Sequence, residues 1–160
     1  VPDNDYRGFL KRRVKDLEEK VKGGSFIDTK GSVIGKHDGY PFYTIGQRKG
    51  LGIAMGEPMY VTHINPKSNT VTLGLKEDLQ SQSVLVRNVN FGKYSAVTDG
   101  FEALSKIRYK DKGSISELHN EEGKIRIDFR EKVYGVAPGQ SAVFYEGDDL
   151  LGGGFICRED

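Results

Sequence analysis

The first apolar pattern along the chain has a helical period. Apolar residues recur at intervals of three or four, at Tyr6, Leu10, Val14, Leu17 and Val21. This spacing places side chains on one face of an α-helix, so we predict a single helix over residues 4–22. Asp3 or Asn4 is available as its N-cap, and Gly23-Gly24 follows as a stop.

From residue 25 onward the apolar period changes to two, which indicates strands. Residues 25–28 and 32–36 form one predicted hairpin, and residues 59–64 and 70–75 form a second. Six further strands are predicted at residues 84–89, 101–109, 114–118, 124–130, 141–145 and 150–157. In the fourth of these, Ile125, Ile127 and Phe129 are expected to face inward. Nothing in the pattern suggests a parallel sheet.

The charged segment Lys76-Glu77-Asp78 follows the second hairpin and separates the two patterns. We therefore predict two domains, residues 1–75 and residues 76–160. The first is an α+β domain with one N-terminal helix and short antiparallel strands. The second is all β, because six short strands joined by polar turns are typical of a small barrel.

Composition narrows the class of protein. The chain has 160 residues, of which 36% are hydrophobic and 29% charged, as in ordinary globular proteins. No apolar run approaches the ~18 residues that span a membrane, so no membrane partner is expected. The single cysteine excludes an internal disulfide, and no Cys/His spacing resembles a zinc site. We expect a reducing, cytoplasmic location and no bound metal.

Charge is unevenly distributed between the two halves. The net charge is +1, but residues 1–75 carry twelve Lys/Arg against eight Asp/Glu and residues 76–160 carry twelve against fifteen. The positive residues of the first half cluster at Lys11-Arg12-Arg13-Lys15 and at Arg48-Lys49. Either cluster could face phosphates, although the first is also consistent with a solvated helix face.

A glycine-rich turn at residues 46–52 carries Gln47, Arg48 and Lys49. It lacks the Gly-Lys-Ser/Thr ending of a P-loop, so it is not expected to bind ATP. Taken alone, such a turn more often joins two strands than holds a ligand.

Four segments, in order, resemble one family. They are Tyr-Thr-Ile-Gly-Gln-Arg-Lys-Gly-Leu-Gly at 43–52, Lys-Ile-Arg-Tyr-Lys at 106–110, Ala-Pro-Gly-Gln-Ser-Ala-Val-Phe-Tyr at 137–145 and Leu-Gly-Gly-Gly-Phe-Ile at 151–156. Together they resemble the central and C-terminal domains of the tRNA-specific 2-thiouridylases (MnmA/TrmU family). The resemblance implies an α+β central domain and a barrel similar to the second domain of elongation factor Tu.

The resemblance also implies a reaction. In the full enzyme, ATP adenylates the C2 oxygen of the wobble uridine of tRNA, and a cysteine persulfide then delivers sulfur and displaces AMP. The family's N-terminal pyrophosphatase domain, which uses ATP and Mg and carries both catalytic cysteines, has no counterpart in this sequence. We therefore expect a fragment that is inactive alone and contains no catalytic residue. Its expected partners are tRNA, the pyrophosphatase domain and a sulfur-donor protein.

Candidate tRNA contacts follow from the same resemblance. It implies tRNA contacts for Arg108, Tyr109 and Gln140, and a role in the tRNA or domain interface for the turn that carries Gln47, Arg48 and Lys49. His37, beside Asp38, is a further candidate for tRNA contact. Alternatives remain open: the charges at 106, 108 and 110 also describe the wet face of a strand, and the turn at 46–52 could serve a domain interface. A lone histidine in a turn more often makes a structural hydrogen bond.

Three other residues receive no role from the sequence. His63 and His119 have no partner motif, and Cys157 ends a strand, where a lone cysteine usually packs as a small hydrophobe. Two other classes of function also remain: a free-standing RNA-binding or translation-factor-like barrel without an enzyme, and a small enzyme that uses Cys157.

Overall fold

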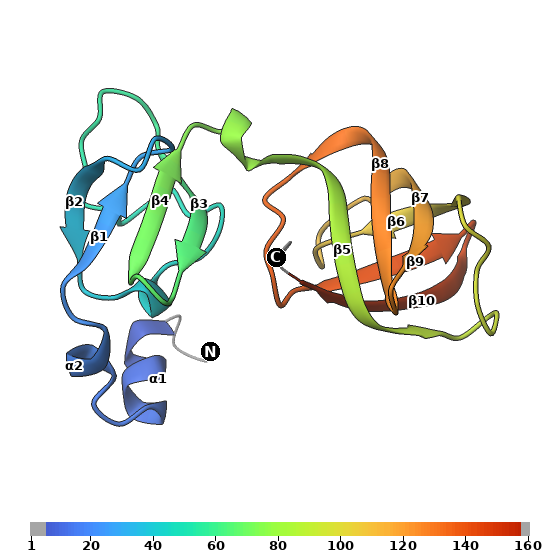
Figure 1. Cartoon of the computed structure of the whole chain (residues 1–160), viewed down its shortest axis with the longest axis horizontal. Helices are drawn as coiled ribbons and strands as arrows, with labels where there is room; N and C mark the ends of the chain where they lie inside the picture. Colours follow the sequence, from blue (N-terminus) through green and yellow to red (C-terminus); the bar gives the residue numbers. More distant parts are fainter. Residues whose placement is uncertain (1–5, 158–160) are drawn as a thin grey trace. The chain divides into compact units, whose positions relative to one another are not determined.

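The computed structural model describes residues 6–157 (Figure 1). The chain divides into two compact units, residues 1–79 and residues 80–160. The predicted division between residues 75 and 76 falls just before a 3₁₀ turn, η2 (Glu77–Leu79), which closes the first unit.

Two helices, α1 (Tyr6–Arg13) and α2 (Leu17–Val21), occupy the segment that was predicted as one helix. The prediction of a continuous helix is wrong because Asp16 has a φ of 58° and a ψ of 27°, a left-handed conformation that breaks an α-helix. Val14 is 41% exposed, whereas Leu17 and Val21 are buried. The apolar face therefore packs into the core mainly after the break.

The C-terminal end of this helical segment agrees with the prediction. The predicted stop is confirmed, since Gly23 has a φ of 79°. The predicted N-caps, Asp3 and Asn4, lie outside the described residues.

Four strands form the sheet of the first unit, in the order β2-β1-β4-β3. They are β1 (Gly24–Ile27), β2 (Val33–His37), β3 (Tyr60–Asn65) and β4 (Thr70–Gly74). Both predicted hairpins are confirmed, but β1 and β4 run parallel. The expectation of no parallel pairing is wrong because this contact joins the two hairpins, and local periodicity carries no information about such pairing.

The core of the first unit lies against this sheet. Phe26, Val61, Val71 and Leu73 have no exposed surface. Between η1 (Tyr40–Phe42) and β3, residues 43–59 contain no helix or strand. This long irregular loop carries the Gly-rich turn.

The second unit is a closed barrel of six strands in the order β10-β5-β8-β7-β6-β9, all antiparallel. Its strands are β5 (Gln80–Phe91), β6 (Phe101–Lys106), β7 (Ser114–Glu121), β8 (Lys124–Tyr134), β9 (Ser141–Glu146) and β10 (Asp149–Ile156). The predicted barrel is confirmed, and Ile125, Ile127 and Phe129 are buried as expected.

The glycine run in β10 has a steric cause. A Cβ on Gly152 would lie 2.3 Å from the Asn90 carbonyl oxygen, and one on Gly153 would lie 2.6 Å from that of Ala142. The backbones of β5 and β9 therefore approach β10 too closely for a side chain. Small residues at this point allow the barrel to close.

Within residues 6–157, neither helix reaches the length and apolar character that a membrane crossing requires.

Candidate functional site

Two loops meet at one end of the barrel. β6 ends at Lys106, which pairs with Val143 near the start of β9. Residues 107–113, which follow β6, therefore lie beside residues 135–140, which precede β9. We call these two loops together the Arg108 end of the barrel.

The Arg108 end brings together the three candidates that come from separate motifs. Arg108 and Gln140 are exposed, and Tyr109 is 100% exposed. The Nη1 atom of Arg108 lies 3.5 Å from the position that a Cβ on Gly135 would take, so the guanidinium reaches across to the second loop. The three side chains therefore share one surface.

Hydrogen bonds hold the backbone of this end, whereas the side chains of Arg108, Tyr109 and Gln140 are exposed. Asp111 accepts hydrogen bonds from the N–H groups of Ile107 (3.4 Å) and Gly113 (3.1 Å), and its own N–H donates to the Arg108 carbonyl at 3.1 Å. On the second loop, the Ile156 N–H donates to the Gln140 carbonyl at 2.8 Å.

The strand predicted at 101–109 is therefore too long. β6 stops at Lys106, and Arg108, Tyr109 and Lys110 lie in turns. The interpretation of Arg108 and Lys110 as the wet face of a strand is wrong, because the alternation of charge continues past the last paired residue. Only Lys106 fits that interpretation, and its Nζ lies 4.9 Å from the centroid of the Tyr145 ring.

In the first unit, the side chain of Gln47 stabilises the glycine-rich turn through hydrogen bonds to its backbone. Its Oε1 accepts from the Thr44 N–H at 3.1 Å, and its Nε2 donates to the Lys49 carbonyl at 3.0 Å. The Gly46 N–H donates to the Val61 carbonyl at 2.8 Å, and the Val61 N–H donates to the Gln47 carbonyl at 2.9 Å. These two hydrogen bonds hold the loop against β3. Arg48 and Lys49 are exposed and are the groups in this turn that can reach a ligand.

His37 lies at the end of β2 and is 6% exposed. Its Nδ1 accepts from the Gly39 N–H at 3.0 Å, and its ring packs against those of Phe26 and Tyr43. Burial lowers the pKa of His37, and the weaker opposing effect of the Ser25 backbone does not offset it. These contacts favour the structural alternative for this residue, since a direct RNA contact would require the ring to leave its packing.

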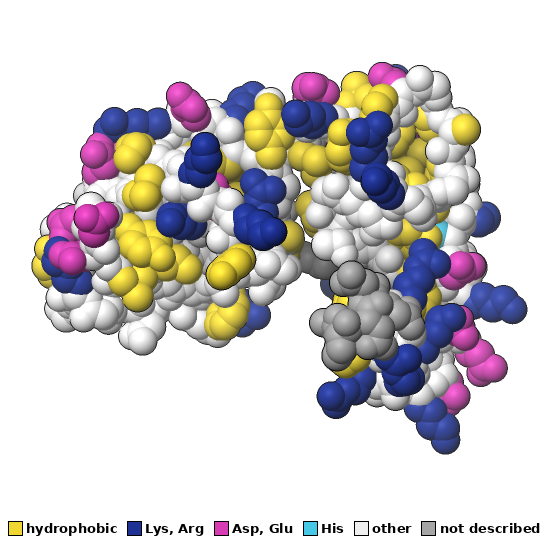
Figure 2. All heavy atoms as spheres, turned by 180° about the vertical axis from the view of Figure 1, so that it is seen from behind, with side chains coloured by type: hydrophobic (Ala, Val, Ile, Leu, Met, Phe, Trp, Pro, Cys, Tyr) yellow, Lys and Arg dark blue, Asp and Glu magenta, His cyan; other side chains and the backbone are white. Residues whose placement is uncertain are grey.

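The basic cluster of the helices is partly engaged in local contacts. Lys11 pairs with Glu18 at 2.5 Å, and the guanidinium of Arg13 lies 5.5 Å from the Phe9 ring centroid. Figure 2 shows many Lys and Arg side chains around these two helices, interspersed with Asp and Glu. A solvated helix face accounts for this arrangement.

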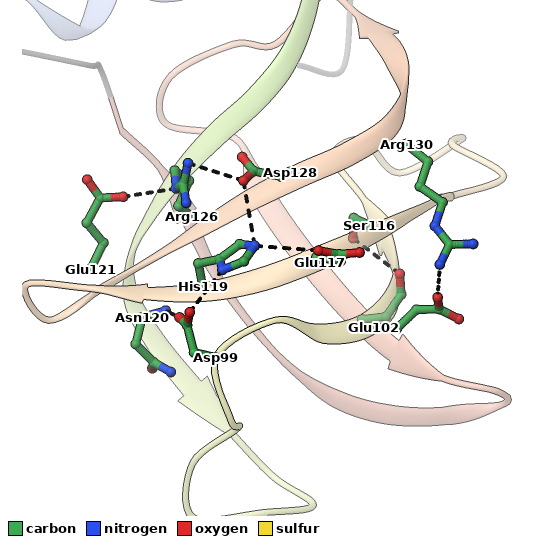
Figure 3. A network of polar contacts seen from close by, with 11 residues as sticks. Asp99, Glu102, Ser116, Glu117, His119, Asn120, Glu121, Arg126, Asp128 and Arg130 are labelled. Atoms are coloured by element: carbon green, nitrogen blue, oxygen red, sulfur yellow. Dashed lines mark hydrogen bonds and ion pairs between the residues drawn. The ribbon is translucent and has the colours of Figure 1, made fainter.

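Sequence reasoning missed a polar network on the outside of β7 and β8 (Figure 3). His119 lies 3.2 Å from Asp99, 3.6 Å from Asp128 and 3.8 Å from Glu117. The cross-strand register pairs His119 with Arg126 and Glu117 with Asp128. The alternation of polar residues along β7 and β8 was a signal for the clustering of His119 with Glu117 and Asp128. No local pattern predicts the presence of Asp99, because it comes from the β5–β6 loop.

This network fastens the β5–β6 loop to the barrel. The Asn120 N–H donates to Asp99 at 2.9 Å, and this bond, followed by the contact with His119, holds the pKa of Asp99 below its usual value. Among residues 6–157, no three His, Cys, Asp or Glu side chains are arranged to bind a metal ion. The arrangement is one of structural ion pairs.

Cys157 follows β10 and is half-buried. Its Sγ donates to the Leu85 carbonyl at 3.3 Å, and its N–H donates to the same oxygen at 2.9 Å. These contacts give the thiol a packing role beside β5.

Comparison with known proteins covers both units. Residues 7–75 match a family described as the tRNA methyl transferase PRC-barrel domain, and residues 81–156 match one described as the aminomethyltransferase beta-barrel domain.

Curated relatives carry the name tRNA-specific 2-thiouridylase MnmA. The one from Amoebophilus asiaticus is 51% identical over 98% of this chain and 42% of its own length. Those from Cytophaga hutchinsonii and Salinibacter ruber are 50% and 48% identical over 98% of this chain, and 43% and 41% of their own lengths. The chain thus spans about two fifths of the length of these relatives.

Proposed function

The chain belongs to the tRNA-specific 2-thiouridylase family, as its central and C-terminal part, and on this premise we propose that it holds the tRNA while catalysis occurs elsewhere in a longer enzyme. The observation that carries this proposal is the gathering of Arg108, Tyr109 and Gln140 at one end of the barrel. All three are exposed there on a fixed backbone.

The chemistry of these side chains suits RNA. A guanidinium can bridge two phosphate oxygens, and an amide offers both a donor and an acceptor to sugar or base edges. A fully exposed tyrosine ring is a platform on which an unpaired base can stack. Lys110 and Lys112 lie in the same loop and add positive charge.

The first unit would add a second contact through Arg48 and Lys49. Both project from a turn whose shape is fixed by Gln47 and Val61. Phosphates are the expected partners of two adjacent exposed cations.

The sulfur chemistry would be supplied outside this chain. The complete enzyme would use ATP and a cysteine persulfide to thiolate C2 of the wobble uridine in the cytoplasm, with a sulfur-donor protein as a further partner. No step of that chemistry is assigned to residues 6–157, because the Gly46 turn lacks the features of a nucleotide loop and Cys157 is engaged with Leu85. The isolated chain would therefore bind tRNA without thiolating it.

The second candidate is a free-standing RNA-binding module without an attached enzyme. It is favoured by the completeness of the two units, each of which has its own core. The two candidates differ in the parent reading frame, which either encodes a cysteine-containing pyrophosphatase domain or does not.

Binding of unmodified tRNA to the full chain tests the barrel contact. Arg108→Ala should weaken binding by about tenfold or more, because a charge-assisted hydrogen bond contributes about 1.5–3 kcal/mol. Tyr109→Phe should retain most of the affinity if the ring stacks, whereas Tyr109→Ala should lose it.

Lys124→Ala is the matched control, since it removes a positive charge at the opposite end of the barrel. Thermal unfolding of each variant separates lost contact from lost fold. Equal affinity of wild type, Arg108→Ala and Tyr109→Ala would remove the Arg108 end from the tRNA interface.

A further inference from the structure

A pocket of about 380 Å³ lies beside the turn that carries Arg48. Such a volume falls within the range of small-ligand sites. The residues that matter for its chemistry are Arg48, Leu51, Ile53, Ala54, Glu57 and Met59.

The floor of this pocket is apolar and fixed. Leu51 is 8% exposed and belongs to the core of the first unit, and Ile53 and Met59 pack against the same core. The Cδ1 atom of Ile53 lies 2.9 Å from the position of a Cβ on Gly35, so Ile53 rests directly on β2. A planar apolar group could pack on this floor without rearranging it.

The rim of the pocket carries two charged side chains. Arg48 and Glu57 are both exposed, and within residues 6–157 neither forms an ion pair or hydrogen bond through its side chain. A ligand here meets a cation on one side and a carboxylate on the other.

The backbone N–H groups of the same loop are also available to a ligand. Apart from the turn at residues 49–50, no N–H group between residues 48 and 56 donates a short backbone hydrogen bond to another described residue. Gly50 and Gly52 have φ values of 74° and 68°, and among residues 6–157 no atom beyond their chain neighbours lies within 4 Å of where their Cβ would be. A ligand rich in acceptors can therefore approach this backbone closely.

From these features we propose that the pocket receives one unpaired nucleotide of RNA. Its base would pack on Leu51, Ile53 and Met59, its phosphate would meet Arg48, and Glu57 would accept a hydrogen bond from an amino group of the base or from a ribose hydroxyl. The proposal rests on the proposed function and deepens it, because it assigns the first unit a single-stranded part of the tRNA. A paired base is excluded, since both of its faces are stacked.

A bulky side chain at Ala54 tests the pocket. The full chain is titrated with an anticodon stem–loop RNA and with a fully paired RNA duplex of the same length. Wild type should prefer the stem–loop by about tenfold, and Ala54→Trp should remove this preference without changing duplex binding, because it blocks the aliphatic floor and burial of a few tens of Å² of apolar surface is worth about this much.

Met55→Trp is the matched control, since Met55 is exposed but does not line the pocket. It should retain the preference. Three outcomes would overturn the pocket assignment while leaving RNA binding by the chain intact. The stem–loop preference could fall equally in both tryptophan variants, it could stay unchanged in Ala54→Trp, or Ala54→Trp could weaken stem–loop and duplex binding equally.

A second pair of variants keeps the test decisive if Ala54→Trp does not fold. Arg48 lines the pocket and Lys49 does not. Arg48→Ala should lower the stem–loop preference, whereas Lys49→Ala should weaken both RNAs equally. Identical behaviour of the two variants overturns the proposal, and failure of wild type to bind either RNA overturns the proposed function as well.

Discussion

The two candidate surfaces are built in opposite ways. At the Arg108 end of the barrel, exposed side chains stand on short loops whose neighbouring strands belong to a closed sheet. In the first unit, Arg48 stands on the irregular loop 43–59, which is fastened to β3 by two backbone hydrogen bonds to Val61. In the barrel, the residues that stabilise the fold differ from those that would contact RNA. In the loop, one segment does both. The contact residues of the barrel should be replaceable without loss of fold.

The largest expected effect is a loss of stability in the barrel that leaves the stability of the first unit unchanged. Gly153→Ala should destabilise the barrel by about 3 kcal/mol, because its Cβ would meet the Ala142 backbone, which cannot move aside as a side chain would. Amide hydrogen exchange should accelerate in β9 and β10 and stay unchanged in β1 and β4.

Gly92→Ala provides the control for this change. Among the described residues, no atom beyond its two chain neighbours lies within 4 Å of where its Cβ would be, so the stability of the barrel should change by less than about 0.5 kcal/mol. Faster exchange in the first unit of Gly153→Ala would show that the two units do not fold independently.

A smaller effect concerns charge in the irregular loop. Replacing Arg48 and Lys49 together by Ala should reduce the slope of log affinity for tRNA against log salt by roughly 1.4–1.8, since each phosphate contact contributes about 0.7–0.9. The measurement is a salt titration of tRNA binding. Replacing Lys93 and Lys124 together is the control, since Lys93 already pairs with Glu146 and Asp149. An unchanged slope in the Arg48/Lys49 variant would assign the turn to protein contacts.

The smallest effect is a pH dependence confined to the first unit. Because burial lowers the pKa of His37 from 6.5, the unfolded chain takes up this proton at a higher pH than the folded chain. Stability is therefore fully present above about pH 6.5 and declines as the pH falls through the folded pKa, by at most about 1.4 kcal/mol per pH unit.

Urea unfolding of the first unit at about pH 5 and about pH 8 measures this decline. His37→Phe should flatten the dependence, and His63→Gln should leave it unchanged because His63 is exposed. An equal dependence in wild type and His37→Phe would contradict the role assigned to burial.

The barrel could be predicted from sequence because its strands alternate clearly. Ile125, Ile127 and Phe129 alternate with charged or polar residues, and all three are buried. The same rule failed at its edge, where the alternation of Lys106, Arg108 and Lys110 continues beyond the paired strand. Local periodicity does not show where pairing with β9 stops.

Features that depend on distant contacts were not predictable from local pattern. The parallel pairing of β1 with β4 joins two hairpins, and the left-handed Asp16 interrupts a regular helical spacing. The approach of Arg108 to Gly135 joins two loops, and that of His119 to Asp99 joins β7 to the β5–β6 loop. The motifs indicated candidate contact residues, and the closure of the barrel determines which of them meet.

Mapping the RNA footprint on the full chain tests the central claim most directly. Amide NMR shifts recorded during titration with unmodified tRNA should change at residues 107–113, 135–140 and 48–59. They should stay unchanged at residues 92–100, 122–123 and 147–148, which form the opposite end of the barrel. Changes confined to that opposite end, or none at residues 107–113 and 135–140 under saturating tRNA, would contradict the assignment of the Arg108 end as the tRNA surface.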